Sequence, residues 1–246
     1  MSTKYIYGFA FIMTLIVAVL LAGSKVMLNP IAVVNEDIFN KRQIMEAIAT
    51  PLEEANNPIA SLSDDQVLAF FDKQVKQIVV DAQGNPVDGI SATEVDLAAE
   101  RKKALPQRRY PVYEVNLDGD NYYIFSVYGS GLWDAIWGNV ALESDLNTVA
   151  GVSFDHAGET PGLGAEIKDN AKWKAQFVGK KIYDGDKYVS IYVRKGGALD
   201  EEHEVDGLSG ATVTADGVTE MLYSGLKAYE PYIEETGKGG TSMNIQ

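Results

Sequence analysis

The chain has 246 residues, a formal charge of −14, no cysteine and two histidines, and 46% of its residues are hydrophobic. This composition is typical of a folded chain with a sizeable core, and the negative charge argues against nucleic-acid binding because phosphate backbones are repelled. The lack of cysteine excludes disulfides, thiolate metal sites and a cysteine nucleophile, and two histidines exclude a three-histidine site, so we expect no metal.

The N-terminal segment is predicted to be a transmembrane anchor over residues 1–25. Twenty uncharged residues lie between Lys4 and Lys25, and as a helix they would span about 30 Å, the thickness of a hydrocarbon core. A cleaved signal peptide is the alternative, because Ala22-Gly23-Ser24 resembles a cleavage site, although the apolar run is long for one. Both interpretations place the remainder outside the cytoplasm.

Residues 26–110 are predicted to form a helical or mixed segment. Helical spacing of apolar residues predicts amphipathic helices over 36–49 and 64–76, the second with Ser63 or Asp64 as its N-cap. A short strand at 78–81 and a third helix over 93–104 follow. We interpret the basic cluster that comes next as a solvated linker. This basic cluster consists of Arg101, Lys102, Lys103, Arg108 and Arg109.

From Pro111 onwards the pattern indicates strands, and we treat residues 111–235 as a second domain. Asp118-Gly119 predicts a hairpin turn between two strands, a further strand is expected at 149–154, and a second hairpin at 181–194.

The end of the chain is predicted to close with an amphipathic helix from residue 215 to about 232, followed by a flexible tail over 236–246. The fold class is therefore α+β: a single N-terminal transmembrane helix and an exported mixed α/β domain.

Three glycine-rich clusters stand out, and each alone is typical of a turn. The third precedes the last predicted helix, where unpaired N–H groups and the helix dipole favour a phosphate. Thr212 or Thr214 would then either carry a phosphoester or simply cap the helix. The spacing matches neither a Walker loop nor a dinucleotide fingerprint. The clusters are Gly129-Ser-Gly-Leu-Trp133, Glu159-Thr-Pro-Gly-Leu-Gly164 and Asp206-Gly-Leu-Ser-Gly-Ala-Thr-Val-Thr214.

The third cluster resembles the flavinylation signal of the FMN-binding domain family. In that family a dedicated flavin transferase joins FMN, through its phosphate, to the threonine that ends the signal, and the signal's acidic residue is needed. The resemblance implies covalent FMN on Thr212, with Thr214 as the fallback. It also implies that other residues of the signal belong to the site, namely Asp206, Ser209, Gly210 and Ala211.

The other two clusters, with His156 before the second, resemble loops of the NqrC family, the C subunits of Na⁺-translocating NADH:quinone reductases. This resemblance implies that the flavin ring lies against the second cluster, where Gly162 and Gly164 allow close approach and Leu163 packs on the ring. Glu159 and Thr160 are candidates for polar contacts. Trp133 would stack on the ring or, as we favour, fill the core. His156 is a proton donor or a structural hydrogen-bonding group.

The same resemblance implies an electron-carrying subunit of an NADH:ubiquinone reductase, an oxidoreductase and translocase. Electrons from NADH would reach this FMN one at a time and pass to the FMN of the B subunit, with Na⁺ export coupled elsewhere. The implied partners are the five other subunits, especially B, D and E. The implied location is a bacterial inner membrane, with the large domain on the periplasmic side. No catalytic side chain, nicotinamide, quinone or Na⁺ site is expected on this chain.

Three alternatives remain at this point. The G subunit of the Rnf electron-transport complex shares the second and third clusters, whereas Gly131-Leu132-Trp133 favours the NqrC family. A membrane-anchored FMN-binding module without turnover would need the flavin only. An exported acidic binding protein would leave both threonines unmodified.

Overall fold

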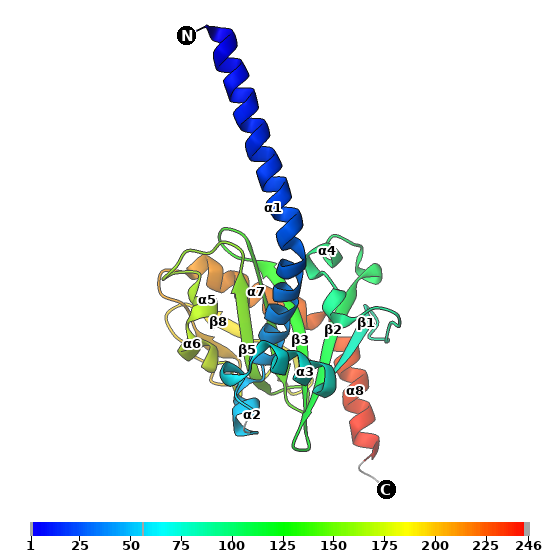
Figure 1. Ribbon diagram of the computed structural model, residues 1–246. Helices are drawn as coiled ribbons and strands as arrows, with labels where there is room; N and C mark the ends of the chain where they lie inside the picture. Colours follow the sequence, from blue (N-terminus) through cyan, green and yellow to red (C-terminus); the bar gives the residue numbers. More distant parts are fainter. Residues whose placement is uncertain (1, 56, 244–246) are drawn as a thin grey trace. The chain divides into compact units, whose positions relative to one another are not determined.

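The computed structural model describes residues 2–55 and 57–243 (Figure 1). The chain divides into two compact units, Met1–Asn40 and Lys41–Gln246, which are described separately.

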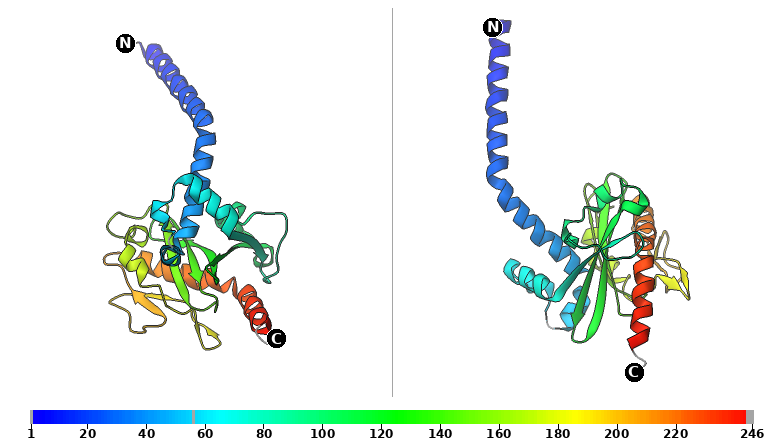
Figure 2. Two further views of the ribbon diagram at one scale, coloured as in Figure 1. Left: turned by 60° about the horizontal axis from the view of Figure 1, so that its bottom comes forward. Right: turned by 90° about the vertical axis from the view of Figure 1, so that its right-hand side faces the viewer.

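The first unit is the N-terminal part of α1 (Thr3–Glu46). Among the described residues, α1 is the one helix whose length and composition would allow it to cross a membrane. Its Thr14 hydroxyl donates to the Ala10 carbonyl oxygen at 2.8 Å, which satisfies the polar side chain within the helix. The helix does not stop near residue 25: it continues through Pro30 and includes most of the helix predicted over 36–49. Proline removes one N–H and bends the helix, and Figure 2 shows a bend in this blue segment.

The second unit is built around one five-stranded antiparallel sheet with the order β1-β2-β3-β4-β5. Asp118 and Gly119 join β2 to β3 with φ of 51° and 106°, which confirms the hairpin predicted there. The strand predicted at 149–154 is also confirmed. The strands are β1 (Val75–Asp81), β2 (Arg109–Leu117), β3 (Asp120–Ser130), β4 (Ala135–Leu142) and β5 (Val149–His156).

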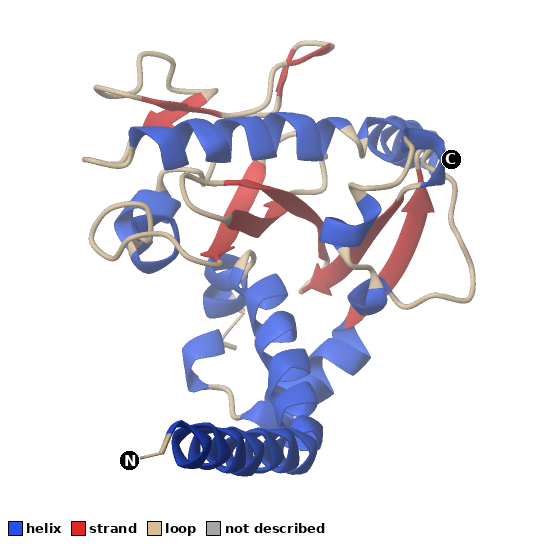
Figure 3. Cartoon of the chain, turned by 90° about the horizontal axis from the view of Figure 1, so that it is seen from above, coloured by secondary structure: helices blue, strands red, loops and turns tan. Residues whose placement is uncertain are grey.

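Helices cover both faces of this sheet (Figures 2 and 3). α7 (Thr212–Lys227) buries Val218, Met221 and Leu222 against one face. The opposite face is covered by residues 41–46 of α1, α2 (Ala49–Glu54) and α3 (Asp64–Gln74), and η1 (Ile59–Ser61) lies between the last two. The predicted N-cap Ser63 accepts from Gln66 N–H in a capping box. Because one core layer lies on each face, the α+β class is confirmed.

The connection from β1 to β2 contains short helical turns instead of the helix predicted over 93–104. They are η2 (Ala92–Glu94), α4 (Leu97–Glu100) and η3 (Leu105–Gln107). Asp96 caps α4 by accepting from Ala99 N–H at 3.1 Å, and the helix ends after one turn at Glu100.

The basic cluster is exposed or half-buried, as expected, but it is not a linker. Arg101 donates to the Tyr128 carbonyl oxygen at 3.0 Å, and Arg108 donates to the carbonyl oxygens of Lys103 and Arg101 at 3.0 and 2.8 Å. These guanidinium groups fold the segment into a defined loop beside β3.

The region between β5 and α7 is mostly loops. The second strand of the hairpin expected at 181–194 is interrupted, because Ser190 has φ of 63° and the two halves of this strand pair with different partners. β6 and β7 form a short hairpin, whereas β8 and β9 are parallel. The elements are α5 (Glu166–Asp169), α6 (Ala171–Ala175), β6 (Tyr183–Asp184), β7 (Lys187–Tyr188), β8 (Tyr192–Arg194) and β9 (Glu204–Asp206).

The C-terminal helix is divided in two, and it begins earlier and ends later than predicted. α7 starts at Thr212, and α8 (Glu230–Met243) begins where Pro231 has no N–H to continue the α7 ladder. α8 includes residues 236–243, where the sequence predicted a flexible tail; residues 244–246 of that tail lie outside the described residues. Tyr229, Tyr232 and Ile233 are buried, which anchors the start of α8 on the core.

Candidate functional site

The beginning of α7 places the two candidate threonines in different environments. Ala211 is the N-cap and no side chain caps the helix, so the alternative that Thr212 or Thr214 is the cap is wrong. Thr212 is the first helical residue, is half-buried, and lines a cavity of about 550 Å³. Thr214 is 1% exposed, and its hydroxyl donates to Glu159 Oε2 at 2.6 Å. One hydroxyl therefore borders the cavity while the other is used internally.

Glu159 connects the three glycine-rich clusters. It lies in the second cluster, accepts from the Trp133 N–H of the first at 2.9 Å, and accepts from Thr214 of the third. Burial raises the pKa of its carboxyl, but hydrogen bonds from Thr214 and from the backbone of residues 132–134 outweigh burial, so the pKa lies below its ordinary value. The ionised carboxylate therefore acts as a structural acceptor at the centre of the site.

The Glu159 carboxylate leaves no room for a side chain at two neighbouring glycines. A Cβ placed on Gly131 or on Gly164 would collide with the Glu159 carboxylate group. The resemblance implies that Gly164 lets a flavin ring approach, whereas the structure shows that both Gly131 and Gly164 make room for the Glu159 carboxylate. Their spacing is therefore explained by the packing of the loops on one another.

Trp133 is 68% exposed, so the expectation that it fills the core is wrong. Its indole Nε1 donates to Thr160 Oγ1 at 3.1 Å, which links the first and second clusters at the surface. The Glu159 N–H donates to His156 Nδ1 at 3.1 Å, so the structure gives His156 the structural hydrogen bond that was one of its two expected roles.

Exposed apolar side chains surround the start of α7. Leu163 is 42% exposed, and a Cβ on Gly210 would lie 2.7 Å from its Cδ2, so Leu163 lies beside the third cluster. Trp133 and Val213 are also exposed, and Val213 borders a further cavity of about 380 Å³ that Gly129–Gly131 line from the other side. Clustered exposed apolar side chains are typical of ligand or partner contact.

Asp206 lines the 550 Å³ cavity, and hydrogen bonds hold it in place there. Its Oδ1 accepts from Ala198 N–H at 2.8 Å, and its backbone N–H donates to Gln176 Oε1 at 3.0 Å. Its carbonyl oxygen accepts from Trp173 Nε1 at 2.7 Å. Asp206 thus holds the 195–198 loop against the third cluster. Ser209 and Gly210 line the same cavity, whereas Ala211 is buried behind it.

A second carboxylate fixes the other side of this loop. Glu204 pairs with Arg194 and accepts from Leu199 N–H at 2.8 Å. The hydrogen bond from Arg194 is the largest influence, and together with backbone donors it lowers the pKa of Glu204 to about 2. The loop therefore has a defined conformation.

Sequence reasoning missed Lys195, Gly196 and Gly197, which line the cavity opposite the third cluster. The signal that could have found them is a Lys-Gly-Gly turn directly after a predicted strand.

The residues at the cavity fit a phosphate-bearing cofactor. A hydroxyl, the unpaired N–H groups at the start of a 16-residue helix and the Lys195 ammonium group all belong to this region. The volume of about 550 Å³ lies in the range of small-molecule sites.

Comparison with known proteins agrees with this geometry. Residues 131–227 match the FMN-binding domain family, a range that includes the second and third clusters. The C subunit of the Na⁺-translocating NADH-quinone reductase from Pasteurella multocida is 32% identical over 243 residues, covering 93% of this chain and 92% of that protein. Its counterpart from Pseudomonas aeruginosa is 34% identical and covers 94% of both chains.

Solved structures show the same relationship. The crystal structure of the C subunit from Parabacteroides distasonis has a TM-score of 0.73 and 33% identity, covering 84% of this chain and 96% of that one. The crystal structure of Shewanella oneidensis NqrC has a TM-score of 0.65 and 26% identity, covering 81% and 99%. The chain therefore belongs to the C subunits of the Na⁺-translocating NADH-quinone reductases.

Proposed function

We propose that the chain carries FMN as a phosphoester on Thr212 and serves as an electron-carrying subunit of its complex. The observation that carries the assignment is the contrast between the two threonines: Thr212 lines the 550 Å³ cavity, whereas the Thr214 hydroxyl is buried and committed to Glu159. A modifying enzyme would have to break the 2.6 Å hydrogen bond to Glu159 before it could use Thr214. Thr212 needs no such rearrangement.

The surrounding residues have distinct proposed roles. The N–H groups at the start of α7 and Lys195 stabilise the phosphate, and Ser209 and Gly210 form the wall next to it. Asp206 positions the 195–198 loop. Leu163 and Trp133 offer exposed apolar surface to the ring, with Gly162 leaving room beside Leu163 and Thr160 holding the indole in place.

FMN supplies reversible electron uptake when it is bound. A covalent bond keeps the cofactor at this site even where free FMN is dilute. The acidic chain, with a formal charge of −14, disfavours added negative charge and so lowers the reduction potential, although only charges within about 8–10 Å contribute strongly at physiological salt.

The cellular setting is part of the proposal. α1 anchors the chain in a bacterial inner membrane, and the second unit lies on the periplasmic side, where a flavin transferase modifies it. The partners are the five other subunits, especially B, D and E, with electrons passing from NADH through this FMN to the FMN of the B subunit. Protease added to spheroplasts should cleave the second unit; protection until the membrane is lysed would place it in the cytoplasm.

The attachment is tested with two isosteric variants of the full chain, produced together with its flavin transferase. Thr212→Val should abolish the fluorescent band in a denaturing gel and the FMN mass on the peptide, because the attacking oxygen is gone. Thr214→Val, the matched control, should keep both. A fluorescent Thr212→Val band that disappears in Thr214→Val would move the bond to Thr214.

Electron transfer is tested separately in the assembled complex. NADH should reduce the flavin of wild-type chain within turnover, and Thr212→Val complexes should assemble but lose quinone reduction. If the flavin stays oxidised while the complex turns over, the chain binds flavin but does not carry electrons.

A further inference from the structure

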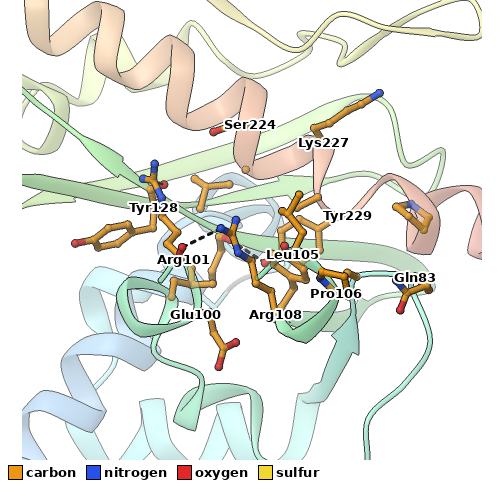
Figure 4. A pocket seen from close by; sticks show the side chains of 18 residues that line it. Gln83, Glu100, Arg101, Leu105, Pro106, Arg108, Tyr128, Ser224, Lys227 and Tyr229 are labelled. Atoms are coloured by element: carbon orange, nitrogen blue, oxygen red, sulfur yellow. Dashed lines mark hydrogen bonds between the residues drawn. The ribbon is translucent and has the colours of Figure 1, made fainter. Parts of the chain in front are cut away.

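A cavity of about 480 Å³ lies at the C-terminal end of α7, between that helix, β3 and the loop before β2 (Figure 4). The α7 residues that line it, from Ser224 to Lys227, lie about 18–23 Å along the helix from Thr212. Its volume lies in the range of small-molecule sites, and much of its lining is apolar or aromatic. The apolar and aromatic lining includes Leu97, Leu105, Pro106, Tyr110, Val127, Tyr128 and Tyr229.

Two guanidinium groups at this cavity have no acidic partner among the described residues. The nitrogen atoms of Arg101 and Arg108 bind backbone carbonyl oxygens, and neither side chain forms an ion pair with a carboxylate there. Arg101 also lies over the Tyr128 ring, with its Cζ 5.8 Å from the centroid. Figure 4 shows both arginines between Tyr128 and Leu105.

The other charged groups of the lining are already compensated. The Glu100 carboxylate binds the Lys103 ammonium at 2.6 Å and accepts from the Arg109 N–H at 3.0 Å. Lys227 pairs with Glu230 at 2.5 Å, and in Figure 4 its side chain extends away from the two arginines. Among the described residues, Arg101 and Arg108 therefore remain without an ion pair beside an apolar cavity, and Asp216 and Glu220 are the carboxylates that line the neighbouring 380 Å³ cavity with Arg101.

We propose that this cavity binds a small organic anion with an apolar body. Arg101 and Arg108 would donate hydrogen bonds to a carboxylate or phosphate head group, and guanidinium groups suit both because of their planar fork of donors. The apolar body would lie against Leu105, Pro106 and the tyrosine rings. This site shares no lining residue with the 550 Å³ cavity at Thr212, whereas Arg101 and Ser224 also line the 380 Å³ cavity beside Val213.

A small ligand fits better than a docked protein chain. Leu105 and Pro106 are the apolar lining residues that are exposed, whereas Val127, Tyr110 and Tyr229 are buried. A specific protein interface needs roughly 800 Å² from each partner, with an apolar centre. The exposed apolar surface here is too restricted for that, while the cavity itself is large enough for an aromatic acid.

The test uses the flavin-loaded full chain in an uncharged detergent, with phenyl phosphate as the probe. We expect saturable binding at one site by calorimetry, and inorganic phosphate should bind at least about tenfold more weakly because it leaves the apolar lining empty. Benzyl alcohol, which lacks the charge, should bind more weakly still. These comparisons require no variant, so they stand even if a substitution impairs folding.

The variants then locate the site. Arg101→Gln and Arg108→Gln should each weaken phenyl phosphate binding by about tenfold or more, because each removes a charge-assisted hydrogen bond. The matched control Arg109→Gln removes an arginine of the same basic cluster that does not line the cavity, and it should leave binding unchanged. Absence of saturable binding, equal affinity for inorganic phosphate, or unchanged binding in the Arg101→Gln/Arg108→Gln double variant would overturn the proposal. Covalent flavin, read from the gel, reports on Thr212 independently.

Discussion

The charged side chains near the two ends of α7 differ in their partners. At the N-terminal end, two buried carboxylates accept several hydrogen bonds. Glu159 accepts from the Thr214 hydroxyl and from backbone N–H groups, and Glu204 accepts from the Arg194 guanidinium and from backbone N–H groups. At the C-terminal end, Arg101 and Arg108 line a cavity without an acidic partner among the described residues.

This difference separates structural charge from charge that is available to a ligand. A carboxylate that accepts several hydrogen bonds organises loops, because removing it leaves several donors unpaired. A guanidinium group that binds backbone carbonyl oxygens and forms no ion pair keeps its charge for another molecule. We therefore expect substitutions at the N-terminal end to affect stability strongly, and neutral substitutions of the two arginines to affect binding more than stability.

The largest effect on stability is expected for Glu159→Gln. The amide has one acceptor oxygen in place of two and brings an NH₂ group toward buried donors, so the chain should lose about 2–3 kcal/mol of unfolding free energy. Thermal unfolding of the full chain in detergent measures this change. Asp169→Asn, a substitution of an exposed carboxylate nearby, is the control and should change little. Equal stability of both variants would show that Glu159 does not organise the three clusters.

A smaller effect is expected from acid. The pKa of Glu204 is about 2 in the folded chain, below its ordinary value of 4.5, so the ionised group stabilises the fold above pH 4.5. That stabilisation is lost as the pH falls from 4.5 toward 2. Between pH 5 and 3 the melting temperature of wild type should therefore fall further than that of Glu204→Gln, by about 2–4 °C. If the melting temperatures of the two proteins change equally with pH, Glu204 is not paired with Arg194 in solution.

The smallest effect on stability is expected for Trp133→Ala. Because the indole is 68% exposed and makes one side-chain hydrogen bond, its loss should change the unfolding free energy by about 0.5 kcal/mol or less. The same substitution should alter the absorption spectrum of the bound flavin if the indole contacts the ring. A loss of several kcal/mol would instead indicate that Trp133 packs in the core.

The parts of the fold that were predictable are those governed by local chemistry. Ser63 caps its helix and Asp118-Gly119 forms a tight turn because neighbouring residues alone satisfy the required geometry. The helix expected over 93–104 is replaced by short turns, since a few residues of helical spacing do not sustain a helix without support from packing. Ser190 ends a strand that alternation alone would continue, because each half pairs with a different neighbour.

In the candidate site, too, some features follow from adjacent residues and others depend on segments that are distant in sequence. The motif from Asp206 to Thr212 is contiguous, so the sequence identifies it directly. The exposure of Trp133, the role of Glu159 and the wall formed by residues 195–197 depend on loops that are distant in sequence. The charges of the basic cluster predict a solvated linker, whereas the position of Arg101 and Arg108 beside a cavity depends on the packing of α7.

The sequence by itself determined a long apolar N-terminal helix and the α+β class, since both follow from composition and periodicity, and it contains a contiguous segment that resembles a flavinylation signal. The tertiary structure decided which threonine hydroxyl borders a cavity and which is held by Glu159, because hydrogen bonding across 55 positions is set by chain packing. It also decided that two arginines share one cavity, since burial and charge compensation exist only when distant segments meet.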